Sequence, residues 1–170
     1  GITSALKESG GGPEDIKAVS YSSQANSFLL LDKAGEPLTP IVMWPDSRVE
    51  AEDDALRRLW APPYMEVTGT DLKGKSFYMA KIRWFMKHKP EIWAKTAYSM
   101  TISDYLTYLL SGERFGDGGT ASLLGILDLK NMQWWKERLE IMEIPEEILS
   151  TPQVPGTVVG KVNKRGAEAL

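Results

Sequence analysis

The sequence predicts an α/β fold, on three observations. Apolar and β-branched residues gather in two short runs, residues 16–22 and Phe28–Leu31, as in strands that are buried on both faces. Helix-forming residues then dominate from about residue 62 to residue 111. The 170 residues are 42% hydrophobic and 25% charged, which is enough for one core and shows no bias toward disorder. We therefore expect a sheet with a helical insertion over residues 62–111.

Composition excludes several classes of function. The net charge is −3 and no dense group of Lys and Arg occurs, so nucleic acid is not an expected partner. The absence of cysteine excludes disulfides, thiol nucleophiles and Cys-ligated zinc, and it fits a reducing compartment such as the cytoplasm. No apolar run is long enough to span a bilayer and no signal peptide is recognisable, so no membrane partner is expected.

The first element predicted along the chain is an amphipathic helix over residues 2–9, which Gly10, Gly11, Gly12 and Pro13 then break. Neither a preceding strand nor a following Gly-Lys-Ser/Thr accompanies these glycines, so they indicate a connector instead of a phosphate-binding loop. A chain that opens on the end of a helix is expected to begin inside a larger fold.

The two predicted strands are separated by Gln24, Ala25 and Asn26, and residues 33–36 have the composition of a hairpin turn. Ligands of α/β proteins usually bind at strand ends, and the amides of Gln24 and Asn26 can both donate to and accept from sugar hydroxyls. The alternative is that these amides only satisfy backbone groups of a turn.

A helix is predicted next, over residues 47–60. Ser47 and Glu50 have the spacing of a capping box, and Pro62 with Pro63 would stop the helix. Two charge pairs have i,i+4 spacing, Asp53 with Arg57 and Asp54 with Arg58. We expect these charges to form a solvated face.

The residues before this helix read Trp44-x-Asp46-x-Arg48. The flat apolar face of Trp44 suits either a sugar ring or the packing of a core. Asp46 can cap the following helix or pair with Arg48, or the turn can reach a ligand. The sequence therefore leaves open whether Trp44 and Asp46 bind a ligand or only stabilise the fold.

The remaining helices follow from periodicity and stop signals. Phe77, Ala80 and Trp84 share one face of a helix that ends near His88, which is expected to be exposed and not catalytic. A short helix over residues 91–95 and a brief strand, Tyr98–Thr101, come next. A helix containing Asp104 then ends at Gly112.

Taken in order, these motifs resemble the FGGY family of carbohydrate kinases, and the resemblance covers residues 16–170 almost continuously. The matching residues are Ser22, Gln24, Asp32, Gly35, Trp44, Asp46, Arg48, Asp104-Tyr105-Leu106, Ser111-Gly112, Asp117, Ala121-Ser122, Gly125, Asp128, Trp134 or Trp135, Ile144-Pro145, Leu149, Gly156-Thr157-Val158-Val159-Gly160 and Val162. No single element is specific, but the order and spacing together are.

The resemblance implies part of a ribonuclease H-like domain of the actin-like ATPase superfamily. Residues 1–170 would be an incomplete N-terminal, sugar-binding domain, without the first hairpin and the C-terminal nucleotide domain. The family transfers the γ-phosphoryl group of ATP, with Mg²⁺, to a hydroxyl of a sugar or polyol.

By the same resemblance, the phosphate-contacting Gly-Thr turn, the adenine site and the catalytic base lie outside this chain, the base beyond Leu170. No catalytic residue is therefore assigned, and Asp104 and Asp117 are not taken to fill that role. The isolated chain is expected to be inactive and to bind neither ATP nor Mg²⁺ tightly.

The resemblance also implies which residues bind substrate. Ala25 and Asn26 would contact it, with Gln24 beside them, Trp44 across the pocket, and Asp46 in the same turn as Trp44. Glycerol kinases usually have Gln-Arg-Glu and xylulokinases Gln-Met-His where this chain has Gln-Ala-Asn. The neutral amide and small Ala25 leave more room and less charge, which predicts a different sugar or polyol.

Two alternatives use the same fold without phosphorylation: a non-catalytic carbohydrate-binding module and a structural remnant. Affinity of the isolated chain for a sugar would distinguish the first from the second. In each case the incomplete sheet would expose strand edges, which favours aggregation or a homo-oligomer.

Overall fold

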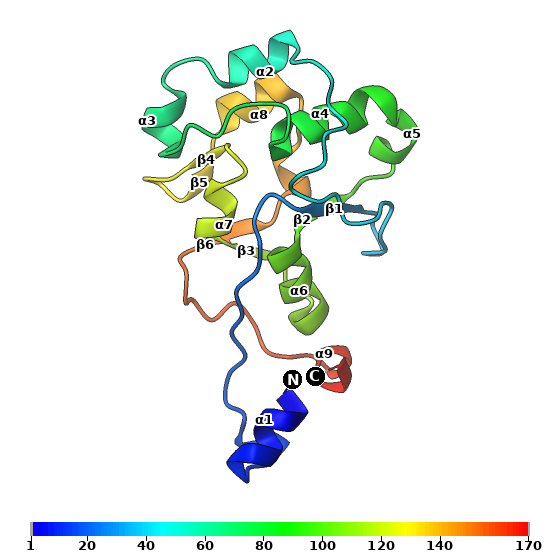
Figure 1. Ribbon diagram of the computed structural model, residues 1–170, viewed down its shortest axis with the longest axis vertical. Helices are drawn as coiled ribbons and strands as arrows, with labels where there is room; N and C mark the ends of the chain where they lie inside the picture. The colour runs from blue at the N-terminus through cyan, green and yellow to red at the C-terminus, as the bar shows by residue number, and fades with distance from the viewer. Residues whose placement is uncertain (1, 170) are drawn as a thin grey trace.

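The computed structural model describes residues 2–169 and is mixed α/β, as predicted (Figure 1). Its α-helices are α1 (Ile2–Ser9), α2 (Asp54–Leu59), α3 (Tyr64–Thr68), α4 (Tyr78–His88), α5 (Pro90–Trp93), α6 (Ile102–Ser111), α7 (Gly118–Ser122), α8 (Lys136–Met142) and α9 (Lys164–Ala169). Its strands are β1 (Phe28–Leu31), β2 (Tyr98–Thr101), β3 (Phe115–Asp117), β4 (Leu127–Asp128), β5 (Gln133–Trp134) and β6 (Thr151–Gln153), with short 3₁₀ helices at η1 (Pro13–Asp15) and η2 (Glu146–Ile148).

The predicted site residues lie on the segments that precede and follow strand β1. It pairs antiparallel with β2, with Phe28 opposite Thr101, and all four of its residues are buried, as four consecutive apolar residues predict. The chain then returns along β1 through bridges at Pro37 and Val42. Gly35 makes this turn at φ +80°, and Asp32 Oδ1 accepts hydrogen bonds from two backbone N–H groups of the turn.

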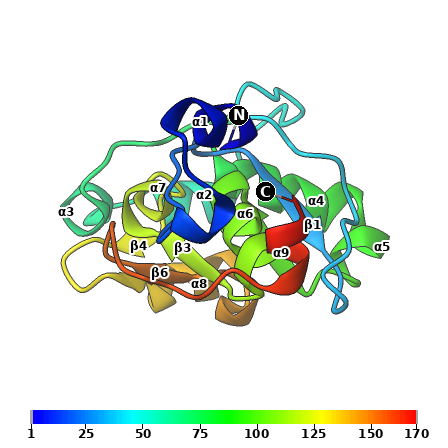
Figure 2. The same cartoon turned by 90° about the horizontal axis from the view of Figure 1, so that it is seen from below.

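The two faces of β1 pack against different helices. Phe28 meets Tyr78 of α4 edge-on, with ring centroids 4.8 Å apart, in the larger of two cores. Leu29 and Leu31 face the other way, into a smaller core with Met100 that α6 covers. The β1–β2 pair thus lies between α4 and α6 (Figure 1). Figure 2 shows α9 beside α6, where Asn163 N donates to Leu110 O at 2.7 Å.

The first predicted strand, residues 16–22, is wrong. The segment is irregular, and its side chains Ile16, Val19 and Tyr21 are 36–39% exposed. Its alternation of apolar residues is suitable for a strand, but a strand requires a neighbour to complete its ladder of hydrogen bonds, and none is present within residues 2–169. Tyr21 connects the segment to α6, because its hydroxyl donates to Ser103 O at 2.7 Å.

The predicted helix over residues 47–60 is also wrong in its extent, since α2 begins only at Asp54. Asp53 is the N-cap and accepts from Leu56 N at 3.0 Å. Its carboxylate pairs with Arg83 and Lys87 of α4 and not with Arg57. The start of α2 is therefore set by the contacts of Asp53 with α4, whose Arg83 lies thirty residues later in the chain. The capping-box spacing of Ser47 and Glu50 does not mark it.

The later elements agree with the sequence. Helices α4, α5 and α6 and strand β2 are present at or near the predicted positions, and Gly112 ends α6 at φ +85°. His88 is exposed and stacks on Trp84, as expected for a helix end. Across the described residues, no helix combines the length and apolarity that crossing a bilayer requires.

Candidate functional site

Two segments that the sequence predicted to share a pocket lie side by side in the structure. Residues 24–27 immediately precede β1, and residues 43–46 follow the segment that returns along it. Phe28 and Val42 exchange both backbone hydrogen bonds, at 3.1 and 2.7 Å, and Ser27 Oγ accepts from Trp44 N at 2.9 Å. Gln24 Nε2 lies 3.8 Å from Met43 Sδ. The β1 hairpin therefore brings the Gln24-Ala25-Asn26 segment next to the segment that carries Trp44.

Asn26 has the most unusual surroundings in this region. Its backbone is in the left-handed region at φ +63°, which Asn tolerates better than most residues. Its Nδ2 donates to Ser76 O at 3.5 Å, in the loop before α4. Its Oδ1 is buried and has no hydrogen-bond partner within the described chain. Buried acceptors are normally satisfied, so an Oδ1 without a partner is unusual.

The neighbours of Asn26 are less constrained. Gln24 is exposed and Ala25 is half-buried. The amide of Gln24 reaches across to Met43, and that of Asn26 reaches a loop fifty residues away. The geometry therefore does not support the interpretation that these amides only satisfy their own turn.

Trp44 is exposed, with 55% of its surface accessible, so it does not pack in the core that residues 2–169 form. Met43 and Ile41 beside it are also exposed, at 43% and 48%. A large apolar side chain held in solvent on a well-bonded turn can form one wall of a binding surface.

Asp46 is committed to Arg48. Its two carboxylate oxygens accept from Arg48 Nε at 2.9 Å and from Arg48 Nη2 at 2.7 Å, and Oδ1 also accepts from Arg48 N at 3.0 Å. These hydrogen bonds hold the pKa of Asp46 at about 2. The Arg48 guanidinium lies over Trp84 and Phe85, with 4.8 and 4.9 Å to the ring centroids. Asp46 thus forms an ion pair that shapes the turn, and it caps no helix.

Sequence reasoning missed Lys81 on α4. Lys81 has no exposed surface, and its Nζ donates to Met43 O and Trp44 O, at 2.8 Å each. Burial lowers its pKa to about 8, against the opposing effect of the nearby Asp46 carboxylate. The signal was available, because Lys81 lies between Tyr78 and Phe85 on the apolar face of the helix.

The two aspartates that were set aside as catalytic candidates have structural roles. Asp104 is 5% exposed and forms a reciprocal capping box with Thr101 at the start of α6. Burial raises its pKa. Asp117 caps α7, accepting from Thr120 N at 2.9 Å. Both side chains are explained by the helices that they begin.

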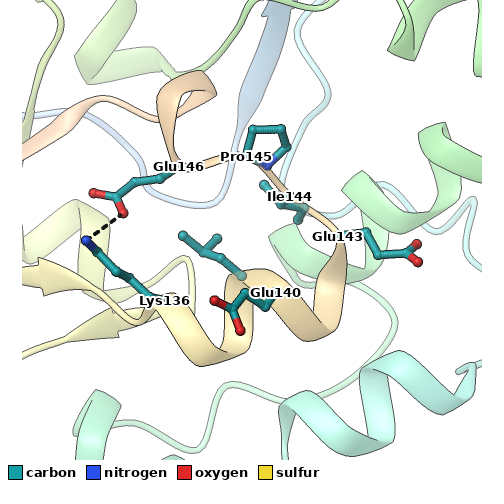
Figure 3. Close-up of a pocket in the computed structure, with 7 residues that line it drawn as sticks. Lys136, Glu140, Glu143, Ile144, Pro145 and Glu146 are labelled. Atoms are coloured by element: carbon teal, nitrogen blue, oxygen red, sulfur yellow. Dashed lines mark ion pairs between the residues drawn. The ribbon is translucent and has the colours of Figure 1, made fainter.

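Two cavities lie close to charged side chains. One, of about 470 Å³, lies between residues 48–53 and α4 and shares Arg48 with the Trp44 turn. The other, of about 360 Å³, lies along α8 and the residues after it, where Lys136 pairs with Glu146 at 3.9 Å and Glu143 points away from that pair (Figure 3). Of the five predicted substrate-binding residues, none lines either cavity.

Comparison with known proteins places this chain among sugar kinases. The profile of the FGGY family of carbohydrate kinases, N-terminal domain, matches residues 1–170. A xylulose kinase of Lactococcus lactis is 26% identical over 80% of the chain, and an autoinducer-2 kinase of Escherichia coli is 30% identical over 96%. The crystal structure of a gluconate kinase from Lactobacillus acidophilus superposes on 96% of the chain with a TM-score of 0.79 and 27% identity.

The chain spans about a third of the length of these relatives, from 27% of the xylulose kinase to 33% of the gluconate kinase. Solved sugar kinases of this kind have the actin-like ATPase fold. The relatives differ in the substrates that their names give, so the likeness shows the family and identifies no substrate.

Proposed function

Because the chain belongs to the FGGY family of carbohydrate kinases, we propose that it supplies part of the substrate wall of an enzyme that transfers the γ-phosphoryl group of ATP to a hydroxyl of a sugar or polyol. Residues 1–170 are then an incomplete N-terminal, sugar-binding domain of that enzyme, and the helices between residues 62 and 111 are an insertion in its ribonuclease H-like sheet. Gln24, Ala25, Asn26, Trp44 and Asp46 make up the wall.

The observation that carries this proposal is the unsatisfied Oδ1 of Asn26, in a segment that is hydrogen-bonded to the turn carrying the exposed Trp44. Leaving a buried acceptor without a donor costs about 1–3 kcal/mol, which a ligand hydroxyl would recover by donating to it. The face of Trp44 can cover the apolar C–H surface of the same ligand. An unpaired acceptor and an exposed aromatic side chain on neighbouring segments are suited to a polyhydroxylated molecule.

The wall also indicates which carbohydrates suit it. Gln24, Ala25 and Asn26 carry no charge, and the Asp46 carboxylate is neutralised by Arg48. The small side chain of Ala25 leaves space beside Asn26. These features favour a neutral sugar or polyol over a sugar acid or a phosphorylated sugar.

ATP and Mg²⁺ belong to the proposed reaction, and we propose that their sites lie outside residues 1–170. Within residues 2–169, no three His, Cys, Asp or Glu side chains are grouped so that they could hold a metal ion. Gly10, Gly11 and Gly12 lack the Lys-Ser/Thr of a phosphate-binding loop. No step of phosphoryl transfer is therefore assigned to a residue of this chain, whose contribution is to bind and orient the acceptor.

The test is a substrate screen with the complete protein that contains this chain, comparing the wild type with Asn26→Gly. Glycine removes the amide without strain, because it adopts φ +63° freely. We expect ATP-dependent phosphorylation of at least one neutral sugar or polyol, and a KM for it that rises about tenfold or more in the variant. Asn131→Gly is the control, because its amide bonds only Asp128 in an exposed turn.

Two results would contradict the proposal. Absence of phosphorylation across a panel of ketoses, pentoses and polyols would exclude the reaction, and sugar binding without turnover would then favour a carbohydrate-binding module. An unchanged KM in Asn26→Gly would exclude Asn26 from the wall.

A further inference from the structure

Lys81 is a buried ammonium whose two hydrogen bonds both go to the backbone of the Trp44 turn. It has no exposed surface, and its Nζ lies 2.8 Å from each of the consecutive carbonyl oxygens of Met43 and Trp44. Burying a charged amine is costly even when it is well bonded. A leucine or methionine would fill this place on the apolar face of α4 at lower cost, so stability alone does not account for the lysine.

The contacts of Lys81 fix the peptide that carries the tryptophan. Trp44 O accepts from Lys81 Nζ, and Trp44 N donates to Ser27 Oγ at 2.9 Å. Met43 O accepts both from Lys81 Nζ and from Asp46 N. Trp44 is therefore bonded on both sides of its Cα, and buried groups set the direction in which its side chain leaves the backbone.

The same helix also supports the opposite side of the wall. Ser76, two residues before α4, accepts from Asn26 Nδ2 through its carbonyl. Within α4, the ring of Tyr78 packs edge-on against Phe28 of β1. Its hydroxyl forms a hydrogen bond of 2.7 Å with Ser99 Oγ of β2. The contact of Asn26 is thus made with the loop that leads into α4, and the contact of Trp44 O with α4 itself.

We propose that Lys81 is a positioning residue that holds the indole of Trp44 in a fixed orientation relative to Asn26. Its ammonium acts through the two carbonyls and touches no substrate. The effect on substrate rests on the proposed function, whereas the effect on the indole does not. Removal of the ammonium should free the Met43–Trp44 peptide and let the indole sample several orientations.

The experiment labels the complete protein with 5-fluorotryptophan and follows the Trp44 resonance, assigned by Trp44→Phe, by ¹⁹F NMR. The test variant is Lys81→Met, which keeps the length of the side chain and removes the donors. The matched control is Lys75→Met, because Lys75 Nζ also donates to a backbone carbonyl, that of Glu50 at 2.9 Å, but from an exposed position. KM for the sugar and kcat are measured on the same samples.

We expect Lys81→Met to shift or broaden the Trp44 resonance and to raise KM about tenfold, with kcat changing less than KM. Lys75→Met should leave all three unchanged. If Lys81→Met does not fold, Lys81→Gln takes its place, since its shorter amide cannot reach both carbonyls.

The two readouts separate the inference from the function on which it rests. If the Trp44 resonance does not move in Lys81→Met, or in Lys81→Gln where that variant replaces it, the positioning role is overturned, whatever happens to KM. A moved resonance with an unchanged KM confirms that Lys81 positions Trp44 and contradicts the placement of Trp44 in the substrate wall. A purely structural lysine would lower the melting temperature and leave the resonance of the folded protein in place.

Discussion

Asp53, the N-cap of α2, lies 2.9 Å from Arg83 Nε of α4, a residue thirty positions later in the chain. The same carboxylate accepts from Leu56 N and pairs with Lys87 Nζ at 2.6 Å. One side chain therefore caps a helix and joins it to a second helix, and only 18% of its surface is accessible. The α2 and α4 helices depend on each other through this contact.

Replacing Asp53 by Ala should destabilise the protein by about 2–4 kcal/mol, since the substitution removes a cap and leaves the partly buried Arg83 with fewer partners. Urea unfolding followed by circular dichroism measures the change. The control is Asp54→Ala, because Asp54 is 77% exposed and its pair with Arg57 is 3.6 Å long. That variant should lose less than about 0.5 kcal/mol. Equal losses in the two variants would contradict the role of Asp53.

Stability should fall steeply in acid, because Asp46 and Asp53 both have folded-state pKa values of about 2, against an ordinary value of 3.8. Hydrogen bonds from Arg48 lower the pKa of Asp46. For Asp53, burial raises the pKa, but Lys87 and Arg83 more than offset it. A depressed carboxyl pKa contributes stability that is complete above pH 3.8 and is lost as the pH falls through 2.

Each of these carboxylates contributes about 2 kcal/mol to that loss. The free energy of unfolding, measured between pH 5 and pH 2, checks this. Asp46→Asn should make the dependence on pH shallower, because it removes one of the two titrating groups. A variant with the wild-type slope would show that Asp46 is not held by Arg48 in solution.

Much of the fold follows from local signals in the sequence. Four consecutive apolar residues are enough for β1, and the helix ending at Gly112 carries its own stop signal. The predictions that were wrong depend on contacts between residues far apart in the sequence. The start of α2 depends on Asp53 meeting α4, and residues 16–22 cannot form a strand without a neighbour, so their composition is insufficient.

The site divides in the same way. Gln24-Ala25-Asn26 and the Trp44 turn come together because β1 forms a hairpin, which the turn at Gly35 predicts. The place of Lys81 on the apolar face of α4 could be predicted from the sequence, but its partners could not, because they are backbone carbonyls of a distant turn. The exposure of Trp44 was equally undetermined, since an apolar aromatic residue suits a core as well as a surface.

Gly35 is required at the turn after β1 for two reasons. Its φ of +80° strains any residue with a side chain, and a Cβ there would overlap the ring and hydroxyl of Tyr108 on α6. Gly35→Ala should therefore cost about 2–4 kcal/mol in thermal or urea unfolding. Gly156→Ala separates the two causes, because Gly156 has φ +85° and no atom within 4 Å of its Cβ position. It should cost about 1 kcal/mol, the strain alone. Matching costs would show that Tyr108 moves aside.

Trp44→Ala should separate binding from stability more cleanly than any other change in the wall. The indole is 55% exposed, so little burial is lost and the free energy of unfolding should fall by less than about 1 kcal/mol. Under the proposed function, the loss of an aromatic face that packs on the sugar should raise KM about tenfold or more.

Phe28→Ala gives the opposite pattern to compare with, because Phe28 is fully buried between Tyr78 and Phe85 and its loss should cost about 3–5 kcal/mol. Urea unfolding and steady-state kinetics on the complete protein measure both quantities. A large loss of stability in Trp44→Ala with an unchanged KM would mean that the indole is buried against a part of the protein outside residues 1–170, and Trp44 would then leave the list of wall residues.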